Sequence, residues 1–296
     1  MDLNNIKFCD FKTDTPLSSY TSFKIGGICP AIIFPKSVEG VQSALQFAIE
    51  NNLNCFIIGN GTNILFPDKS PYSLIIRICS PFLDEIKETT NPYIFQIQAG
   101  TLISTFLKFV TENSLTGAEF LSGIPGTIGG ATFMNAGAQG KYISEIIRKV
   151  EVMDKNYKTY WLDKSESGFE YRNSRFKTSG EIILGAEIEL THGNKEKINT
   201  EISELLNYRN NKLPLDLPSA GCVFKNPKNG PAAYFIELAG CKGLKIGGAL
   251  VSPKHANFIL NAGDATYKDV KSLIVEVKKR VYDKLSISLE TEVIIL

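Results

Sequence analysis

GAEFLSGIPGTIGGATFMNAGAQG, residues 117–140, is the stretch around which the chain is organised. Its seven glycines are Gly117, Gly123, Gly126, Gly129, Gly130, Gly137 and Gly140. A flexible linker combines glycine with polar residues, whereas this stretch places apolar side chains such as Leu121 and Phe133 between its glycines. Glycine allows close approach of the backbone to a ligand, and converging N–H groups can cradle an anion or a planar polar ring. The pattern therefore leaves two interpretations open: a loop that holds a large cofactor, or a buried turn whose glycines serve packing.

Composition and charge place the chain among ordinary globular proteins. It has 296 residues, of which 43% are hydrophobic and 21% charged, enough for two or three domains with a sizeable core. The formal net charge of +1 gives no reason to expect a nucleic-acid or membrane-surface partner. No apolar run approaches the roughly 20 residues of a membrane helix, and we expect no obligate protein partner.

Cysteine and histidine usage indicates the compartment and argues against a metal site. The six cysteines form no CxxC pair, which favours a reducing cytoplasm. The N-terminal MDLNNIKFCD has no basic region followed by an apolar core, so we expect no secretion signal. His192 and His255 are the only histidines, so we expect no metal site built on histidine.

Residues 16–66 have the pattern strand, helix, strand. Residues 31–34 predict a strand, and Ser37 can cap a helix whose inward positions are Val38, Val41, Leu45, Ala48 and Ile49. In CFIIGNGTNILF, residues 55–66, the Asn60-Gly61 pair between apolar runs favours a β-hairpin. The alternative is a phosphate loop in which the amides of residues 59–63 face a pyrophosphate, although the dinucleotide fingerprint is absent.

The middle of the chain predicts more strands around one helix. We expect strands at 74–79, 94–98 and 181–190 and a hairpin of 146–153 with 157–162. Thr101 is expected to cap a helix that ends before Gly117, with Leu102, Phe106, Phe109 and Val110 inward. On its residues alone, FEYRNSRFK at 169–177 favours a strand with alternating faces.

A composition shift at 191–196 predicts a domain boundary. After it we expect a helix at 196–209 with Ile198, Ile202, Leu205 and Leu206 on one face, a shaped loop at 213–231, a helix at 233–240 and a strand pair within 246–262. Thr266 is expected to cap the last long helix, whose core face is Val270, Leu273, Ile274, Val277 and Val281. The final stretch predicts a strand with Glu290 and Glu292 on one face, a pattern usually found facing solvent.

Six motifs now support a family resemblance. They are GNGTNIL at 59–65, SGIPGTIGGATFMNAGAQG at 122–140, YRNSRFK at 171–177, PSAGCVFKNP at 218–227, KGLKIGGALVSPKHANFILN at 242–261 and LETEV at 289–293. In this order the chain resembles the UDP-N-acetylenolpyruvoylglucosamine reductases, flavoproteins that make UDP-N-acetylmuramate for peptidoglycan. Its length is similar to that of the subclass without an extra substrate-covering loop.

The resemblance implies an α+β fold with two domains. Residues 1–191 would form an FAD-binding domain of the vanillyl-alcohol-oxidase type in two subdomains, about 1–80 and 81–191, and residues 192–296 a C-terminal substrate-binding domain. No histidine precedes His192, so the FAD would be bound noncovalently. The GNGTN loop would then bind phosphate, which overrides the hairpin preference, and the glycine stretch would contact cofactor.

The matching positions give the implied site residues. FAD would contact Gly59, Asn60, Gly61, Thr62, Asn63, Gly123, Ile124, Pro125, Gly126, Gly129, Gly130, Ala131, Asn135, Gly137 and Ala138. The UDP-sugar substrate would contact Tyr171, Lys212, Lys225, Asn226, Lys242 and His255. The implied catalytic residues are Arg172, Cys222 and Glu292.

The implied chemistry is reduction of an enolpyruvyl ether, with NADPH as cosubstrate. Hydride from reduced flavin would reach the methylene carbon, Arg172 would hold the substrate carboxylate, and Glu292 beside that carboxylate would be protonated. Cys222 stands where the family usually has serine, and its thiol could supply the proton. Ile294 stands where the family often has arginine, and Asn60 and Thr62 where glycine and serine are commoner.

Two other functions stay open on the sequence. One is a different flavin-dependent oxidase or dehydrogenase with the same fold, against which the motifs after residue 217 argue. The other is a non-catalytic flavin- or nucleotide-binding protein, suggested only by the departures at Cys222 and Ile294; Arg172 and Glu292 argue against it.

Overall fold

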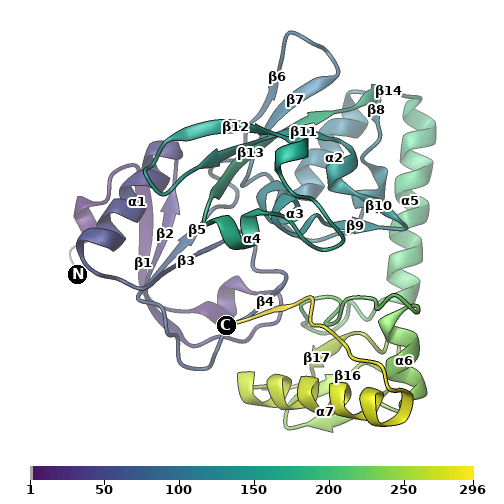
Figure 1. Cartoon of the computed structure of the whole chain (residues 1–296). Coiled ribbons are helices and arrows are strands. Elements are labelled where there is room, and N and C mark those ends of the chain that lie inside the picture. Colours follow the sequence, from purple (N-terminus) through teal and green to yellow (C-terminus); the bar gives the residue numbers. More distant parts are fainter. Residues whose placement is uncertain (1–2) are drawn as a thin grey trace. The chain divides into compact units, whose positions relative to one another are not determined.

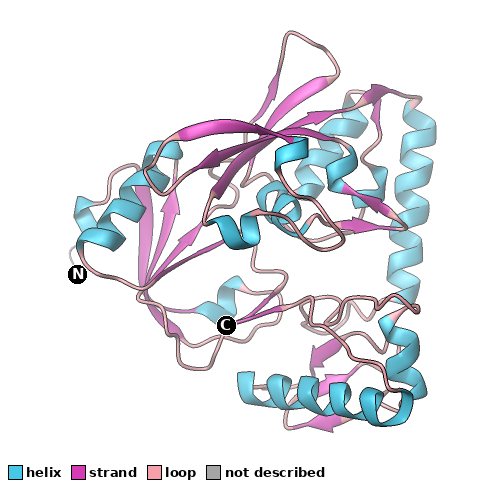
Figure 2. Ribbon diagram, viewed as in Figure 1, coloured by secondary structure: helices cyan, strands magenta, loops and turns pink. Residues whose placement is uncertain are grey.

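In a computed structural model, residues 3–296 are described, and their contacts divide the chain into two compact units. Unit 1 contains Met1–Lys12, Ile32–Asn60 and Leu74–Arg209, and unit 2 contains Thr13–Ala31, Gly61–Ser73 and Asn210–Leu296. Each unit mixes helices and strands (Figure 2). The expected domain limit at residues 191 and 192 stays a prediction.

Seven α-helices and eighteen strands occur along the described residues (Figure 1). The helices are α1 (Val38–Glu50), α2 (Ile103–Glu112), α3 (Ile128–Met134), α4 (Phe176–Ser179), α5 (Lys195–Lys212), α6 (Ala232–Leu238) and α7 (Tyr267–Leu285). The strands are β1 (Cys9–Pro16), β2 (Ile28–Pro35), β3 (Cys55–Ile58), β4 (Ile64–Leu65), β5 (Leu74–Arg77), β6 (Ile86–Glu88), β7 (Ile94–Gln98), β8 (Leu115–Thr116), β9 (Gly137–Ala138), β10 (Lys141–Tyr142), β11 (Ile147–Met153), β12 (Thr159–Asp163), β13 (Ile182–Glu189), β14 (Thr191–His192), β15 (Lys245–Ile246), β16 (Ala249–Val251), β17 (Ile259–Asn261) and β18 (Ile294–Ile295).

A five-stranded sheet is the centre of unit 1. Its order is β12-β11-β13-β7-β6, and every neighbouring pair is antiparallel. The expected hairpin is confirmed as β11 with β12, in which Val150 faces Leu162. Helix α3 packs against β13 and β7, so the glycine stretch is held on this sheet.

A four-stranded sheet has the order β1-β2-β5-β3, and its pair β3 and β5 is parallel, with Ile58 beside Arg77. The expected cap of α1 is confirmed, because the Ser37 hydroxyl accepts a hydrogen bond from Gly40 N–H. The buried face of α1 includes Val41 and Ala48, but Ile49 is 66% exposed. Ile49 follows Ala48 by about 100° around the helix, beyond the buried face.

The hairpin interpretation of Asn60-Gly61 is wrong. Strand β3 pairs with β5, and β4 pairs in parallel with β18, so the two strands that flank the loop belong to different sheets. Gly61 has a φ of +65°, as a glycine in a tight turn can adopt. The loop is therefore a connection between sheets.

Three other local expectations are corrected. Helix α2 begins after Leu102 without a side-chain cap, so Thr101 is not its cap. It ends at Glu112 instead of just before Gly117. Residues 169–177 do not form a strand, because Arg172 adopts a φ of +52° within a turn. Residues Ile128–Met134 inside the glycine stretch, expected as a loop or a buried turn, form helix α3.

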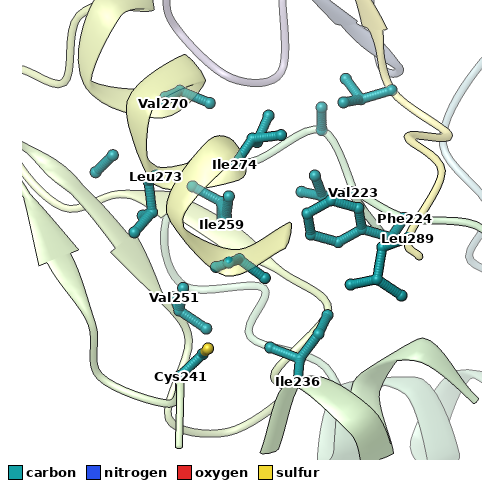
Figure 3. Packing of buried hydrophobic residues seen from close by; sticks show 14 of the residues in the cluster. Val223, Phe224, Ile236, Cys241, Val251, Ile259, Val270, Leu273, Ile274 and Leu289 are labelled. Atoms are coloured by element: carbon teal, nitrogen blue, oxygen red, sulfur yellow. The ribbon is translucent and has the colours of Figure 1, made fainter. Parts of the chain in front are cut away.

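Unit 2 is organised by helix α7 over a three-stranded sheet of order β15-β16-β17. The expected core face of α7 is confirmed, since all five of its residues are buried: Val270, Leu273, Ile274, Val277 and Val281. They pack in one cluster with Val223, Phe224, Ile259 and Leu289 (Figure 3). The apolar core therefore joins α7 to the segments that carry Cys222 and Glu292.

Helix α5 differs from its expectation. Only Ile198 among its residues is buried, and Leu206, expected on an inward face, is 38% exposed.

None of the helices formed by residues 3–296 is both long and apolar enough to cross a lipid bilayer.

The start of α7 generates a stability prediction. The Thr266 hydroxyl accepts a hydrogen bond from Asp269 N–H at 3.1 Å, and the Asp269 carboxylate accepts one from Thr266 N–H at 3.0 Å. Thr266→Ala should lower the free energy of unfolding by about 1 kcal/mol, measured as a lower urea midpoint. Thr266→Ser keeps the capping hydroxyl and should stay close to the wild type; equal losses for both variants would contradict the capping role.

Candidate functional site

The end of the glycine stretch is tied to the turn that carries Arg172. Asn135 ends α3 in the left-handed conformation, with a φ of 44°. Its side-chain Nδ2 donates to the Glu170 carbonyl at 2.9 Å, and its Oδ1 accepts from Ser144 N–H at 3.2 Å. Asn135 is 3% exposed, so one buried amide fixes two neighbouring segments of unit 1.

The Arg172 side chain is oriented by the same stretch. Its Nη2 donates to the Gly137 carbonyl at 2.8 Å, and its guanidinium lies 5.5 Å from the centre of the Tyr171 ring. The Lys177 ammonium donates to the Arg172 carbonyl at 2.7 Å. Unit 1 therefore brings Arg172 and Tyr171 to Gly137, and presents a permanent positive charge there.

Three buried hydroxyls in unit 1 were not selected as site residues from the sequence. Thr101, Ser122 and Thr132 are 0%, 2% and 0% exposed, and within residues 3–296 their side-chain oxygens have no hydrogen-bond partner. Buried polar atoms are ordinarily hydrogen-bonded. These three donors fit a bound polar cofactor, and no sequence motif distinguishes them from packing threonines and serines.

Several N–H groups of residues 124–131 are used inside the protein. Ile124 donates to Leu121, Gly129 to Ala99 and Ala131 to Thr127, and Gly130 donates to the Thr127 hydroxyl. A Cβ on Gly129 would lie 2.8 Å from the Ala99 Cβ, so this glycine serves close packing. Contacts of these residues with a cofactor would therefore use other atoms.

The other residues of the glycine stretch that were predicted to contact the cofactor have varied surroundings. Leu206 and Arg209 of α5 pack over Gly123, the Gly126 carbonyl accepts from Ile103 N–H at 3.0 Å, and Pro125 is exposed. Gly137 and Ala138 form β9, which pairs with β10. These positions stay predictions as cofactor contacts.

In the GNGTN loop, Asn60 is oriented by Arg77. The Arg77 Nη2 donates to the Asn60 Oδ1 at 3.0 Å and lies 3.4 Å from the Cys79 Sγ. A guanidinium can only donate, so the carbonyl side of the Asn60 amide faces Arg77 and its NH₂ side faces away. A Cβ on Gly59 would lie 2.7 Å from the Thr127 hydroxyl. This end of the loop is therefore close to the start of α3.

The other end of the loop belongs to unit 2 and holds the last segment of the chain. The Asn63 Nδ2 donates to the Glu292 carbonyl at 3.2 Å, and the Asn63 carbonyl accepts from Ile294 N–H at 3.0 Å. Gly61 is fixed by its carbonyl, which accepts from Ser22 N–H at 3.0 Å; Thr62 is half-buried beside it. Glu292 is therefore positioned by the residue that ends the GNGTN loop.

Unit 2 also brings Cys222 close to Glu292 along the backbone. Glu292 N–H donates to the Val223 carbonyl at 2.8 Å. The backbone of Cys222 forms an isolated antiparallel β-bridge with that of Phe258. Cys222 is half-buried and forms no disulfide. Two of the three expected catalytic residues thus lie on adjacent extended segments of one unit, whereas Arg172 belongs to the other unit.

The predicted substrate residues of unit 2 lie around its loops and helix ends. Lys225 pairs with Glu290 at 2.7 Å and Lys242 with Glu237 at 2.7 Å. The Asn226 Oδ1 accepts from the N–H of Ala232, at the start of α6, at 2.9 Å. Lys212, the last residue of α5, is exposed.

His255 is half-buried and keeps its ring against Phe258, with the two ring centres 5.1 Å apart. Within residues 3–296 its buried Nδ1 has no hydrogen-bond partner. Burial lowers the pKa of His255 below its ordinary 6.5, and the positive charge of Lys242 lowers it further. The imidazole is therefore neutral at pH 7.

A surface hollow of about 780 Å³ lies elsewhere on unit 1, between Gln139 and α5. Its lining includes three carboxylates, Glu196, Glu201 and Glu204. Three acids would repel phosphate groups, so this hollow is not a candidate for an anionic cofactor.

The lowered pKa of His255 generates a pH prediction. Because the unfolded chain binds the proton more readily, the contribution of the neutral imidazole to stability is fully present above pH 6.5 and is lost as the pH falls below 6.5 through the lowered pKa of the folded state. Between about pH 7.5 and about pH 5.5 the wild-type Tm should fall more than that of His255→Gln. His192→Gln removes an exposed histidine and should behave as the wild type; equal pH dependence of all three proteins would contradict the assignment.

Comparison with known families identifies both parts of the chain. Residues 29–163 match the FAD binding domain family, and residues 213–296 match the C-terminal domain of UDP-N-acetylenolpyruvoylglucosamine reductase. The predicted fold class is thereby confirmed: an α+β chain with an FAD-binding part and a C-terminal substrate-binding part.

Whole-chain relatives carry the same name. The UDP-N-acetylenolpyruvoylglucosamine reductase of Alkaliphilus oremlandii is 40% identical over 280 residues, which cover 95% of this chain and 91% of the relative. That of Clostridium tetani is 39% identical over 294 residues, covering 99% and 94%. The crystal structure of the Thermus caldophilus enzyme is 30% identical, superposes with a TM-score of 0.81, and the match covers 97% of this chain and 98% of that one. The chain therefore belongs to the UDP-N-acetylenolpyruvoylglucosamine reductase family, oxidoreductases of peptidoglycan synthesis.

Proposed function

We propose that this chain uses NADPH and FAD to reduce UDP-N-acetylglucosamine enolpyruvate to UDP-N-acetylmuramate. The observation that carries the proposal is the hydrogen bond from Glu292 N–H to the Val223 carbonyl, because it joins the backbone next to Cys222, the proposed proton donor, to the backbone of Glu292. This pairing is what an enzyme needs when it must bind a carboxylate and protonate the adjacent carbon.

The residues of unit 1 fit a noncovalent FAD. The amide NH₂ of Asn60 faces away from Arg77, as a donor to a phosphate would, and the buried hydroxyls of Thr101, Ser122 and Thr132 are donors for a polar ring system. When bound, FAD supplies hydride transfer from NADPH to the methylene carbon of the substrate. The other cofactor contacts expected from the sequence are proposed unchanged.

Arg172 is proposed to hold the substrate carboxylate. When hydride adds to the methylene carbon, the carbon that bears the carboxylate becomes negative and its charge is delocalised onto the carboxylate, which a guanidinium can bind through two parallel hydrogen bonds. The Nη2 contact with the Gly137 carbonyl at 2.8 Å supports this role, because it fixes the orientation of the guanidinium before substrate arrives.

Cys222 is proposed to complete the reaction by giving its Sγ proton to the carbon that bears the carboxylate. A thiol with an ordinary pKa of about 8.5 is mostly protonated near neutral pH, and the resulting thiolate takes a new proton from solvent. Glu292 is proposed to be protonated beside the substrate carboxylate, because two negative charges in one place raise the pKa of one of them.

The substrate, including its phosphates, is proposed to contact Tyr171, Lys212, Lys225, Asn226, Lys242 and His255. The carboxylate partners of Lys225 and Lys242 are 75% and 57% exposed. Ion pairs of that exposure are weak, so a pyrophosphate can replace them at little cost. The neutral imidazole of His255 can donate one hydrogen bond without adding charge. None of the six cysteines forms a disulfide, which supports a cytoplasmic location.

An anaerobic stopped-flow experiment tests the function. The purified protein is reduced with NADPH and then mixed with UDP-N-acetylglucosamine enolpyruvate, while the flavin absorbance is followed. We expect rapid return of the oxidised flavin band. A protein that NADPH reduces but this substrate does not reoxidise would contradict the proposed substrate and favour another flavin-dependent activity, and a protein that binds no FAD would contradict the proposal as a whole.

The thiol generates a separate prediction. Cys222→Ala should leave flavin reduction by NADPH within about twofold of the wild type and slow reoxidation by substrate roughly 10²- to 10⁴-fold, the usual contribution of a general acid. Cys222→Ser restores a proton donor and should recover part of the rate. Reoxidation of Cys222→Ala at the wild-type rate would exclude Cys222 as the donor.

The orientation of Asn60 generates a prediction on cofactor binding. In Asn60→Asp an oxygen can still accept from Arg77, but a negative charge replaces the donor that faces away from it. The dissociation constant of FAD should rise about tenfold or more, without loss of Tm in the apoprotein, measured by flavin fluorescence titration and thermal unfolding.

Asn91→Asp is the matched control for this substitution. Its Oδ1 accepts from Tyr93 N–H at an exposed turn, and the substitution adds the same charge to unit 1. It should leave the affinity for FAD unchanged. Equal affinity for FAD in the Asn60 and Asn91 variants would show that the Asn60 amide does not contact the cofactor.

A further inference from the structure

Asn257 makes three hydrogen bonds to the two residues that follow Cys222. Phe224 N–H donates to its Oδ1 at 2.9 Å, and its Nδ2 donates to the Phe224 carbonyl at 2.8 Å. Its own carbonyl accepts from Val223 N–H at 2.8 Å. Asn257 is 3% exposed, so these bonds form away from solvent.

The segment of residues 222–225 is held on its other side by the end of the chain. The Val223 carbonyl accepts from Glu292 N–H at 2.8 Å, and Lys225 N–H donates to the Glu290 carbonyl at 2.9 Å. Phe224 forms an isolated bridge with Thr291. The segment therefore lies between residues 256–258 and residues 290–293, all within unit 2.

A side-chain amide is suited to this place. Phe224 is 2% exposed, so its N–H and carbonyl need partners inside the protein. A carboxamide offers one acceptor and one donor side by side, which is the pair of groups that a neighbouring strand would supply. The Asn257 side chain thus takes the place of a neighbouring strand at Phe224, and it fixes the segment without adding a strand to the sheet.

We propose that Asn257 is a positioning residue for the proton-transfer step: its amide fixes the backbone of residues 222–224 against residues 290–293 and so sets the placement of the Cys222 thiol relative to Glu292. This inference rests on the proposed function, in which Cys222 gives the proton and Glu292 lies at the substrate carboxylate. Asn257 touches neither group through its side chain and acts through the Phe224 peptide.

Asn257→Asp tests this role with little change of shape. The introduced carboxylate can still accept from Phe224 N–H, but an acceptor oxygen then faces the Phe224 carbonyl. We expect reoxidation of the reduced flavin by substrate to slow about tenfold or more at pH 8, a fraction of a general acid's contribution. Flavin reduction by NADPH should stay within about twofold of the wild type, because that half-reaction needs no proton donor.

The same variant supplies a pH signature. A protonated carboxyl can donate to the Phe224 carbonyl as the amide does, and burial raises the pKa of such a group. The ratio of variant to wild-type reoxidation rates should therefore approach one at low pH and fall as the pH rises. A loss of packing alone would lower the rate ratio equally at every pH.

Asn261→Ala is the matched control. The Asn261 amide also bonds the backbone, donating to the Phe23 carbonyl at 3.2 Å and accepting from Ala265 N–H at 3.0 Å, but not at residues 222–224. It should lower the Tm while leaving the ratio of reoxidation to reduction rates unchanged. Asn257→Ser, which keeps one polar group for Phe224, serves if Asn257→Asp does not fold, and should also slow reoxidation selectively.

The outcomes separate this inference from the proposed function. If Cys222→Ala slows reoxidation but the folded Asn257 variants reoxidise within about twofold of the wild type, Asn257 is not a positioning residue and Cys222 stays the donor. If both half-reactions slow equally, Asn257 serves stability alone and the inference is overturned. If Cys222→Ala itself reoxidises at the wild-type rate, the proposed donor fails first.

Discussion

The pairing of residues 222–225 with a segment on either side is the constraint on which unit 2 depends. The Val223 N–H donates to the Asn257 carbonyl and the Val223 carbonyl accepts from Glu292 N–H, both at 2.8 Å. The side chains of Val223 and Phe224 pack into the cluster under α7. Apolar burial thus holds the segment in place while the backbone bonds fix its direction, and Cys222, its first residue, is half-buried.

In unit 1, an asparagine likewise holds the irregular segment that carries a proposed catalytic residue. Arg172 lies in a turn with positive φ, and irregular backbone of this kind needs partners for its polar groups. Asn135 supplies one through the Glu170 carbonyl, and Gly137 accepts from the guanidinium itself. The glycine stretch therefore supports Arg172, in addition to its proposed contacts with the cofactor.

Periodicity predicted the regular elements well and the site segments poorly. Thr266 and the five core residues of α7 agree with the structure because helix capping and 3.6-residue spacing are local properties. Asn60-Gly61 has the strongest local hairpin signal, yet β3 and β4 pair with strands distant in sequence. Arg172 and Asn257 could not be placed by pattern, because their conformations depend on single side-chain to backbone bonds.

Asparagine recurs where a chemical group sits on irregular backbone. Asn63 holds the Glu292 carbonyl, Asn135 holds the turn before Arg172, and Asn257 holds the segment after Cys222. A carboxamide is short, uncharged and both donor and acceptor, so it can satisfy a peptide group without the desolvation cost of a buried charge. Each segment that carries a proposed catalytic residue is thus held by a neutral side chain, which adds no charge beside Arg172, Cys222 or Glu292.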